Sequence, residues 1–149
     1  MPLTSNPERW IVLTYRVPRT PTANRVYVWR KLKQLGAIAL QDAAWVLPAT
    51  VKTQEHFQWL AAEIAELGGE ARLWHSTLQL EISEEALRKQ FEAQVETEYK
   101  EIFTKLKRKG RDLPALARQY QRVVDKDFFS SDLGNTVRQK LLAAEEKAS

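Results

Sequence analysis

The chain has 149 residues, enough for one domain or for one small domain with an extension, because a domain typically needs on the order of 100 to 150 residues. Hydrophobic residues make up 44% and charged residues 28%, a balance typical of a globular protein with a packed core. Cysteine is absent, which excludes disulfides, thiolate nucleophiles and cysteine-ligated metal centres, and the net charge of +4 favours anionic partners.

The first predicted strand lies at residues 9–17, where a β-branched and aromatic run is closed by Pro18. A helix is predicted over residues 23–35, with Thr22 as its N-cap and Gly36 in the left-handed conformation at its C-terminus. The buried stripe of this helix should contain Val28, Leu32 and Leu35, with Trp29 beside it.

Two short strands, a second helix and a fourth strand are predicted next. Residues 38–40 and 45–47 should form strands that a tight hairpin connects. Residues 55–67 carry apolar side chains at helical spacing, and the glycine pair at 68–69 should end this second helix. A fourth strand is predicted over residues 71–77.

The resulting order, β-α-β-β-α-β within about 75 residues, is the ferredoxin-like pattern. It predicts an α+β fold in which both helices cover one face of a four-stranded antiparallel sheet, so that the other face is free for a partner or for the rest of the chain. Residues 1–82 are therefore predicted to form a ferredoxin-like domain, and residues 83–149 a helical extension packed on this head or on a second subunit.

The predicted extension consists of helices. Apolar residues recur every three or four positions over residues 84–109, which predicts a long helix that Gly110 ends. Asp112 and Pro114 should start a second helix, and a turn at residues 128–132 precedes a last one. Because helices with one apolar face are marginal alone, we expect this C-terminal helical tail to pack as a hairpin, on the sheet or on a second subunit.

Positive charge is concentrated in two segments. Residues 1–35 contain seven basic residues and a single acid, and residues 105–111 contain five basic residues. Arginines at a strand end and on the following helix can bind an oxyanion, and such clusters attract polyanions such as nucleic acid, although a merely solvated basic surface is the alternative. The candidate anion-binding or nucleic-acid-binding residues are Arg16, Arg19, Arg25, Arg30, Lys31, Lys33, Lys105, Lys107, Arg108, Lys109 and Arg111.

Tryptophan is abundant for a chain of this length, with Trp10, Trp29, Trp45, Trp59 and Trp74. Each lies in a predicted element among aliphatic neighbours, so core packing is predicted for most of them, and stacking on unpaired bases is the alternative. Trp74 fits a core position least, because it lies late in a strand that belongs at a sheet edge.

Sequence motifs for catalysis and for metal or cofactor binding are missing. His56 and His75 lie on different predicted elements without a metal-binding spacing, and no glycine-rich phosphate loop or Gly-x-Ser-x-Gly motif occurs. We therefore expect a binding protein, not an enzyme, with no cofactor and no metal. Residues 1–7 lack the features of a secretion signal, and no apolar run reaches the roughly 18 residues of a membrane span, so we expect a cytoplasmic protein without a membrane partner.

Several segments follow one another in an order that is characteristic when taken together. They are Trp10-Ile11-Val12-Leu13, Pro18, the run from Arg25 to Ala37, Trp45-Val46-Leu47-Pro48, Gly68-Gly69-Glu70-Ala71 and Asp127-Phe128-Phe129. Over nearly the whole chain this arrangement resembles the N-terminal domain of the ChrB chromate-resistance proteins. The resemblance implies a regulator that binds promoter DNA of a chromate efflux operon and responds to chromate, an oxyanion similar to sulfate. Proteins of that family continue into a second domain, where chromate sensing could reside.

The first strand and helix are also similar to those of ferredoxin-like domains in PaaX-type repressors and in the small CRISPR adaptation nuclease. That nuclease type carries a metal-binding aspartate near the end of its first strand, where this chain has Tyr15 and Arg16. The resemblance therefore gives no support to metal-dependent cleavage.

Three classes of function remain. The leading hypothesis is a regulatory module that binds duplex DNA, and a domain that binds chromate or sulfate is a variant of it. The second is a helical dimerisation module that forms a homodimer without binding DNA. The third, an enzyme such as a degenerate nuclease or a chromate reductase, lacks the flavin motif, NAD motif or clustered acids that it would need.

Overall fold

A computed structural model of the chain describes residues 9–149, apart from the side chains of Glu81 and Ile82. The expectation that residues 1–7 are not a secretion signal concerns a segment that lies outside the described residues. The chain divides into two compact units, the first ending at Glu81 and the second running from Ile82 to Ser149. Each unit has buried apolar side chains of its own.

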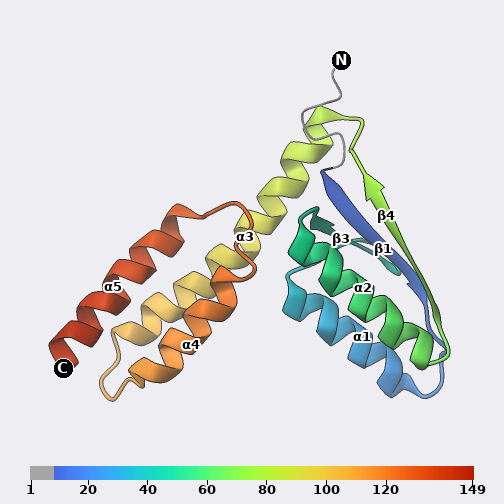
Figure 1. Ribbon diagram of the computed structural model, residues 1–149. Coiled ribbons are helices and arrows are strands. Elements are labelled where there is room, and N and C mark those ends of the chain that lie inside the picture. The colour runs from blue at the N-terminus through green and yellow to red at the C-terminus, as the bar shows by residue number, and fades with distance from the viewer. Residues whose placement is uncertain (1–8) are drawn as a thin grey trace. The chain divides into compact units, whose positions relative to one another are not determined.

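The first unit contains a four-stranded antiparallel sheet with the strand order β2-β3-β1-β4 (Figure 1). Its strands are Trp10–Arg16 (β1), Ile38–Gln41 (β2), Ala44–Pro48 (β3) and Glu70–Ser76 (β4). The helices Thr22–Leu35 (α1) and Val51–Glu66 (α2) both cover the same face of this sheet (Figure 1). The predicted α+β, ferredoxin-like head with its β-α-β-β-α-β order is therefore confirmed.

Fully buried side chains fill the layer between the sheet and the two helices. Ile11 and Leu13 alternate along β1 and are completely buried, and the strand register places Leu47 opposite Ile11. The helices contribute the buried residues Val28, Leu32, Phe57, Leu60 and Ile64. Leu35 was expected in the same stripe as Val28 and Leu32 but is only partly buried, because α1 ends there and the chain turns away at Gly36.

The helix ends show where local sequence decides the fold. Gly36 has the predicted left-handed conformation, with φ 83°, and ends α1. The prediction that Thr22 caps α1 is wrong, because Thr22 is the first helical residue and Pro21 takes the cap position, where no side chain of the described residues caps the helix. Pro21 can stand there because the first turn of a helix has backbone N–H groups without partners in any case.

The start of α2 differs from the prediction in a similar way. The helix begins at Val51, four residues before the predicted start, because Thr50 and Thr53 form a reciprocal capping box. The Thr50 hydroxyl accepts from the Thr53 N–H at 3.0 Å, and the Thr53 hydroxyl accepts from the Thr50 N–H at 2.9 Å. Apolar periodicity alone does not reveal this first turn.

The second unit consists of the helices Glu81–Leu106 (α3), Leu113–Val124 (α4) and Asp132–Ala148 (α5). They share one apolar core, formed by Val95, Tyr99, Ile102, Leu106, Leu116, Val123, Val137, Leu141 and Ala144. The predicted C-terminal helices are thus confirmed, and the structure adds that all three pack together. Their packing on the head or on a second subunit stays a prediction.

Despite the length of α3, no helix among residues 9–149 is long and apolar enough to cross a membrane.

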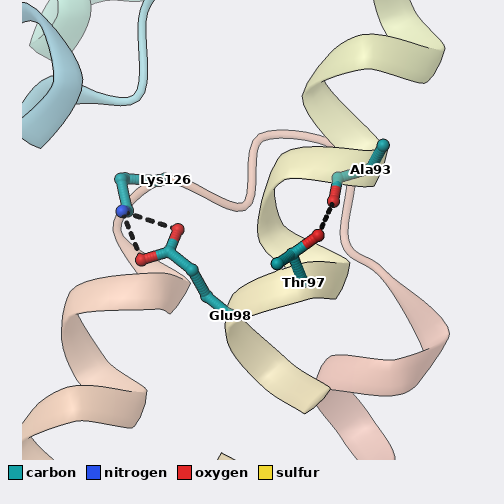
Figure 2. Close-up of polar contacts among 4 residues, drawn as sticks. All are labelled: Ala93, Thr97, Glu98 and Lys126. Atoms are coloured by element: carbon teal, nitrogen blue, oxygen red, sulfur yellow. Dashed lines mark hydrogen bonds and ion pairs between the residues drawn. The ribbon is translucent and has the colours of Figure 1, made fainter. Parts of the chain in front are cut away.

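Polar contacts tie the connection between α4 and α5 to α3. The Tyr99 hydroxyl donates to Asp127 Oδ2 at 2.9 Å, and the same carboxylate accepts from the Ser131 N–H. Lys126 Nζ donates to both carboxylate oxygens of Glu98, at 2.8 and 2.7 Å, as Figure 2 shows. The figure also shows Thr97, whose hydroxyl donates to the Ala93 carbonyl one turn earlier in α3 and so forms no link to another helix.

Replacing Lys126 by methionine should lower the free energy of unfolding by about 2 kcal/mol. The Lys126 side chain is only 15% exposed, so its loss leaves the Glu98 carboxylate partly desolvated and unpaired. The cost should lie between the roughly 0–1 kcal/mol of an exposed ion pair and the roughly 3–5 kcal/mol of breaking a buried one. Urea unfolding followed by circular dichroism measures it. Adding Glu98→Gln to Lys126→Met should recover part of the loss, whereas equal stability of Lys126→Met and the wild type would show that the pair contributes nothing.

Candidate functional site

Three of the predicted basic residues gather around one hollow on the first unit, which we call the arginine hollow. Its lining includes Tyr15, Arg16, Arg19, Arg25, Trp29 and Asp42, and its volume is about 630 Å³. The elements explain the convergence. The end of β1 supplies Tyr15 and Arg16, the loop after it supplies Arg19, α1 supplies Arg25 and Trp29, and the turn between β2 and β3 supplies Asp42.

The arginine hollow carries an excess of positive charge. Three arginines line it, together with a single acidic residue, Asp42. Arg16 is partly neutralised, since its Nη2 atom lies 3.0 Å from Glu70 Oε2, but both side chains are largely exposed and such a pair is worth at most about 1 kcal/mol. Within residues 9–149, no carboxylate forms an ion pair with Arg19 or Arg25.

Tyr15 connects the arginine hollow to the core beneath it. Burial raises the pKa of the Tyr15 phenol above its usual value, while a hydrogen bond with Trp45 and the positive charge of Arg25 act in the opposite direction. Arg25 and Tyr15 both line the hollow. Trp45, which also lines the hollow, is buried.

The other predicted residues of the first segment lie elsewhere on α1. Arg30, Lys31 and Lys33 do not line the arginine hollow. Lys31 Nζ lies 5.7 Å from the centroid of the Tyr27 ring, a cation–π distance. Arg72, which sequence reasoning did not select, lines a neighbouring hollow together with Arg16, because strand pairing brings β4 beside β1.

The predicted basic residues of the second segment belong to the second unit. Lys105, Arg108, Lys109 and Arg111 line one hollow there. Lys107 lines another together with Arg111, Lys140 and Lys147, over a floor that includes Phe103 and Leu106. Sequence reasoning missed Lys140 and Lys147, because α5 brings them next to basic residues from much earlier in the chain and no local pattern signals this.

Some of these cations also have structural contacts. Arg111 donates from Nη1 to the Leu106 carbonyl at 2.9 Å and so caps the end of α3. Lys107 Nζ lies 4.8 Å from the centroid of the Phe103 ring, and Lys105 Nζ donates weakly to Gln119 Oε1 at 3.4 Å. α3 ends at Leu106, three residues before the predicted end. The carbonyl of this last helical residue is the one that accepts the hydrogen bond from Arg111.

The prediction that most tryptophans are core residues is wrong. Trp10 and Trp45 are buried, but Trp29, Trp59 and Trp74 are 52%, 77% and 50% exposed. Trp74, which fitted a core position least, is tied at the sheet by a 3.0 Å hydrogen bond from its Nε1 to the Thr14 hydroxyl. Aliphatic neighbours in the sequence did not imply burial, since on a helix they occupy other faces than Trp29 and Trp59 do.

Among the side chains that the structure describes in residues 9–149, no three His, Asp or Glu residues are grouped so that they could hold a metal ion. The hollows described above are lined by arginine and lysine side chains. Guanidinium and ammonium groups are hydrogen-bond donors that suit anionic ligands.

Comparisons with known proteins agree on one family. A family model described as "Protein ChrB, N-terminal" matches residues 25–109. Protein ChrB of Cupriavidus metallidurans is 35% identical to the chain over 78 residues, which make up 52% of this chain and 24% of that relative. The match thus spans about a quarter of the relative's length. No solved structure matches the chain. The family match includes Arg25 and Trp29 of the arginine hollow, whereas Arg16 and Arg19 precede it.

Proposed function

Because the chain belongs to the family of ChrB N-terminal domains, we propose that it is a regulatory DNA-binding module of a chromate-resistance protein. In this proposal the chain binds without catalysing a reaction and needs no cofactor. The observation that carries the proposal is the arginine hollow, which three arginines from separate elements line.

The chemistry of the arginine hollow suits phosphate groups. A guanidinium presents a planar fork of donors that matches two phosphate oxygens, and it stays charged at every physiological pH. Arg19 and Arg25 are available for this role, because no carboxylate of the described chain pairs with them. Arg16 can exchange its exposed ion pair with Glu70 for a phosphate at little cost.

The basic residues of the second unit add to this electrostatic attraction. Each phosphate that a lysine or arginine neutralises releases condensed counterions from DNA, so affinity falls as salt rises. If about five phosphates are engaged, the logarithm of the affinity for duplex DNA should fall against the logarithm of the salt concentration with a slope of about −4.5. Fluorescence anisotropy of a labelled duplex across salt concentrations measures this slope.

The double variant Arg19→Ala/Arg25→Ala should bind duplex DNA more weakly, with a slope of about −2.7, because two phosphate contacts are lost. A matched control is Arg122→Ala/Arg138→Ala, which removes the same charge from exposed positions of α4 and α5 that line none of the hollows described above. The control should keep a slope near that of the wild type. Binding that is absent at low salt, or that does not respond to salt, would refute the proposal.

A tetrahedral oxyanion such as chromate or sulfate is a second candidate ligand, favoured by the same three arginines. It would need only the arginine hollow and not the basic residues of the second unit. Millimolar sulfate at constant ionic strength should then displace DNA from the wild type. If it leaves DNA binding unchanged, the hollow contacts the DNA backbone and is not an oxyanion sensor.

A further inference from the structure

Trp29 is the exposed aromatic side chain of the arginine hollow. This residue is 52% exposed, although an indole is among the side chains that gain most from burial. The other lining tryptophan, Trp45, is buried. Trp29 therefore offers exposed apolar surface in a hollow that three arginines also line.

These two features together match the two halves of a nucleotide. Guanidinium groups bind the phosphate, and an exposed indole stacks on the face of a base. The lining residues Gln41 and Asp42 add an amide and a carboxylate, which can donate to or accept from the edge of a base. A volume of about 630 Å³ also falls in the range of roughly 300–1,000 Å³ that small-molecule sites occupy.

We propose that the arginine hollow binds an unpaired nucleotide, with its phosphate on Arg19 and Arg25 and its base against Trp29, so that the chain prefers single-stranded nucleic acid or a duplex with an unpaired base. In an intact duplex the faces of the bases are stacked on one another, and only their edges and the phosphates are accessible. Trp29 can therefore stack only on an unpaired base. This inference rests on the proposed nucleic-acid binding and specifies the form of its ligand.

The test compares three labelled oligonucleotides of equal length, each at low salt. They are a mixed-sequence single strand of about twelve nucleotides, the matching duplex, and an abasic strand that keeps the sugar-phosphate backbone. The wild type should bind the single strand about tenfold more tightly than the abasic strand, because one stacked base contributes this much. The abasic strand isolates the contribution of phosphates from that of bases.

Trp29→Ala should lose about tenfold in affinity for the single strand and less than twofold for the duplex, whereas Trp29→Phe should stay within about threefold of the wild type. The matched control is Trp59→Ala, which removes an equally large exposed ring from α2, outside the arginine hollow. This control should bind all three oligonucleotides like the wild type. Because both rings are exposed, melting temperatures of the two variants should remain close to that of the wild type.

Two outcomes separate this inference from the proposed function. Equal binding of the single strand and the abasic strand, or equal losses in Trp29→Ala and Trp59→Ala, would overturn the unpaired-nucleotide site while salt-dependent duplex binding still supports the DNA-binding module. If no oligonucleotide binds at low salt, both proposals fail together.

Discussion

Replacing Gly69 by alanine should lower the free energy of unfolding of the first unit by about 3 kcal/mol, which is the upper end of the range for forcing extra atoms into a packed site. A Cβ atom at Gly69 would lie 2.2 Å from the Arg16 carbonyl oxygen and 3.0 Å from side-chain atoms of Ile64 and Val17. The oxygen is a backbone atom at the end of β1, where Arg16 pairs with Glu70. It cannot rotate away as a flexible side chain could, so the strand pairing itself must shift.

Gly68→Ala is the matched control for this prediction. Gly68 has φ +88°, and its nearest contact for an added Cβ is Pro18 at 3.7 Å, so the cost there is conformational, about 1 to 2 kcal/mol, without a clash. Urea unfolding of both variants should rank Gly69→Ala as the less stable. If Gly69→Ala is as stable as Gly68→Ala, the close approach of the two strands is not a constraint. Because Arg16 lines the arginine hollow, duplex affinity should fall in Gly69→Ala even under conditions where it is folded.

The fold could be predicted from the sequence wherever a local rule and the tertiary structure agree. The two strand–helix–strand repeats follow from apolar periodicity, and Gly36 and Gly68 mark helix ends because their positive φ disfavours other residues. The first residues of the helices were harder to predict from the sequence. Thr50 and Thr53 act as a pair, and neither residue alone reveals that α2 begins at Val51. Threonine is a residue type that often occupies the N-cap position, but in α1 Pro21 occupies this position and Thr22 is the first helical residue.

Part of the candidate site could be predicted, because some of its residues lie on elements that follow one another directly in the chain. Arg16, Arg19 and Arg25 lie on consecutive elements that the chain must fold back on one another, so their convergence follows from a strand–loop–helix order. Arg72 and Lys140 come from elements far along the chain, and only strand pairing or helix packing brings them to their partners. The exposure of Trp29 was not predictable either, because it depends on which face of α1 meets the sheet.

The two basic segments differ in how much of their charge is available to a ligand. Arg111 caps α3, and Lys107 lies over the Phe103 ring, so both have contacts within the second unit that a phosphate would have to supplement or replace. Arg19 and Arg25 have no ion pair within the described chain. Substitutions at Arg19 and Arg25 should therefore change binding with little effect on stability, whereas Arg111→Ala should affect both.

In the second unit, Gly134→Ala should lower the free energy of unfolding by about 2 kcal/mol. An added Cβ would lie 2.8 Å from Cζ and Oη of Tyr99 and 2.9 Å from its Cε2. The Tyr99 ring cannot move aside easily, because it is 1% exposed and its hydroxyl donates to Asp127. Overpacking should cost about 3 kcal/mol, and the better helix propensity of alanine over glycine should return about 1 kcal/mol of it.

A double-mutant cycle distinguishes this clash from a general sensitivity of α5. Tyr99→Leu alone should be destabilising, because it leaves a cavity and removes the hydrogen bond to Asp127. If the ring is what an alanine at position 134 meets, Tyr99→Leu/Gly134→Ala should cost less than the sum of the two single variants, since the added methyl group then occupies vacated space. Additive losses in urea unfolding would refute the steric explanation. Glycine is needed at position 134 because the Tyr99 ring leaves no room for a Cβ atom. At Gly110 the reason is the backbone conformation, since φ is +72° and no atom lies within 4 Å of an added Cβ.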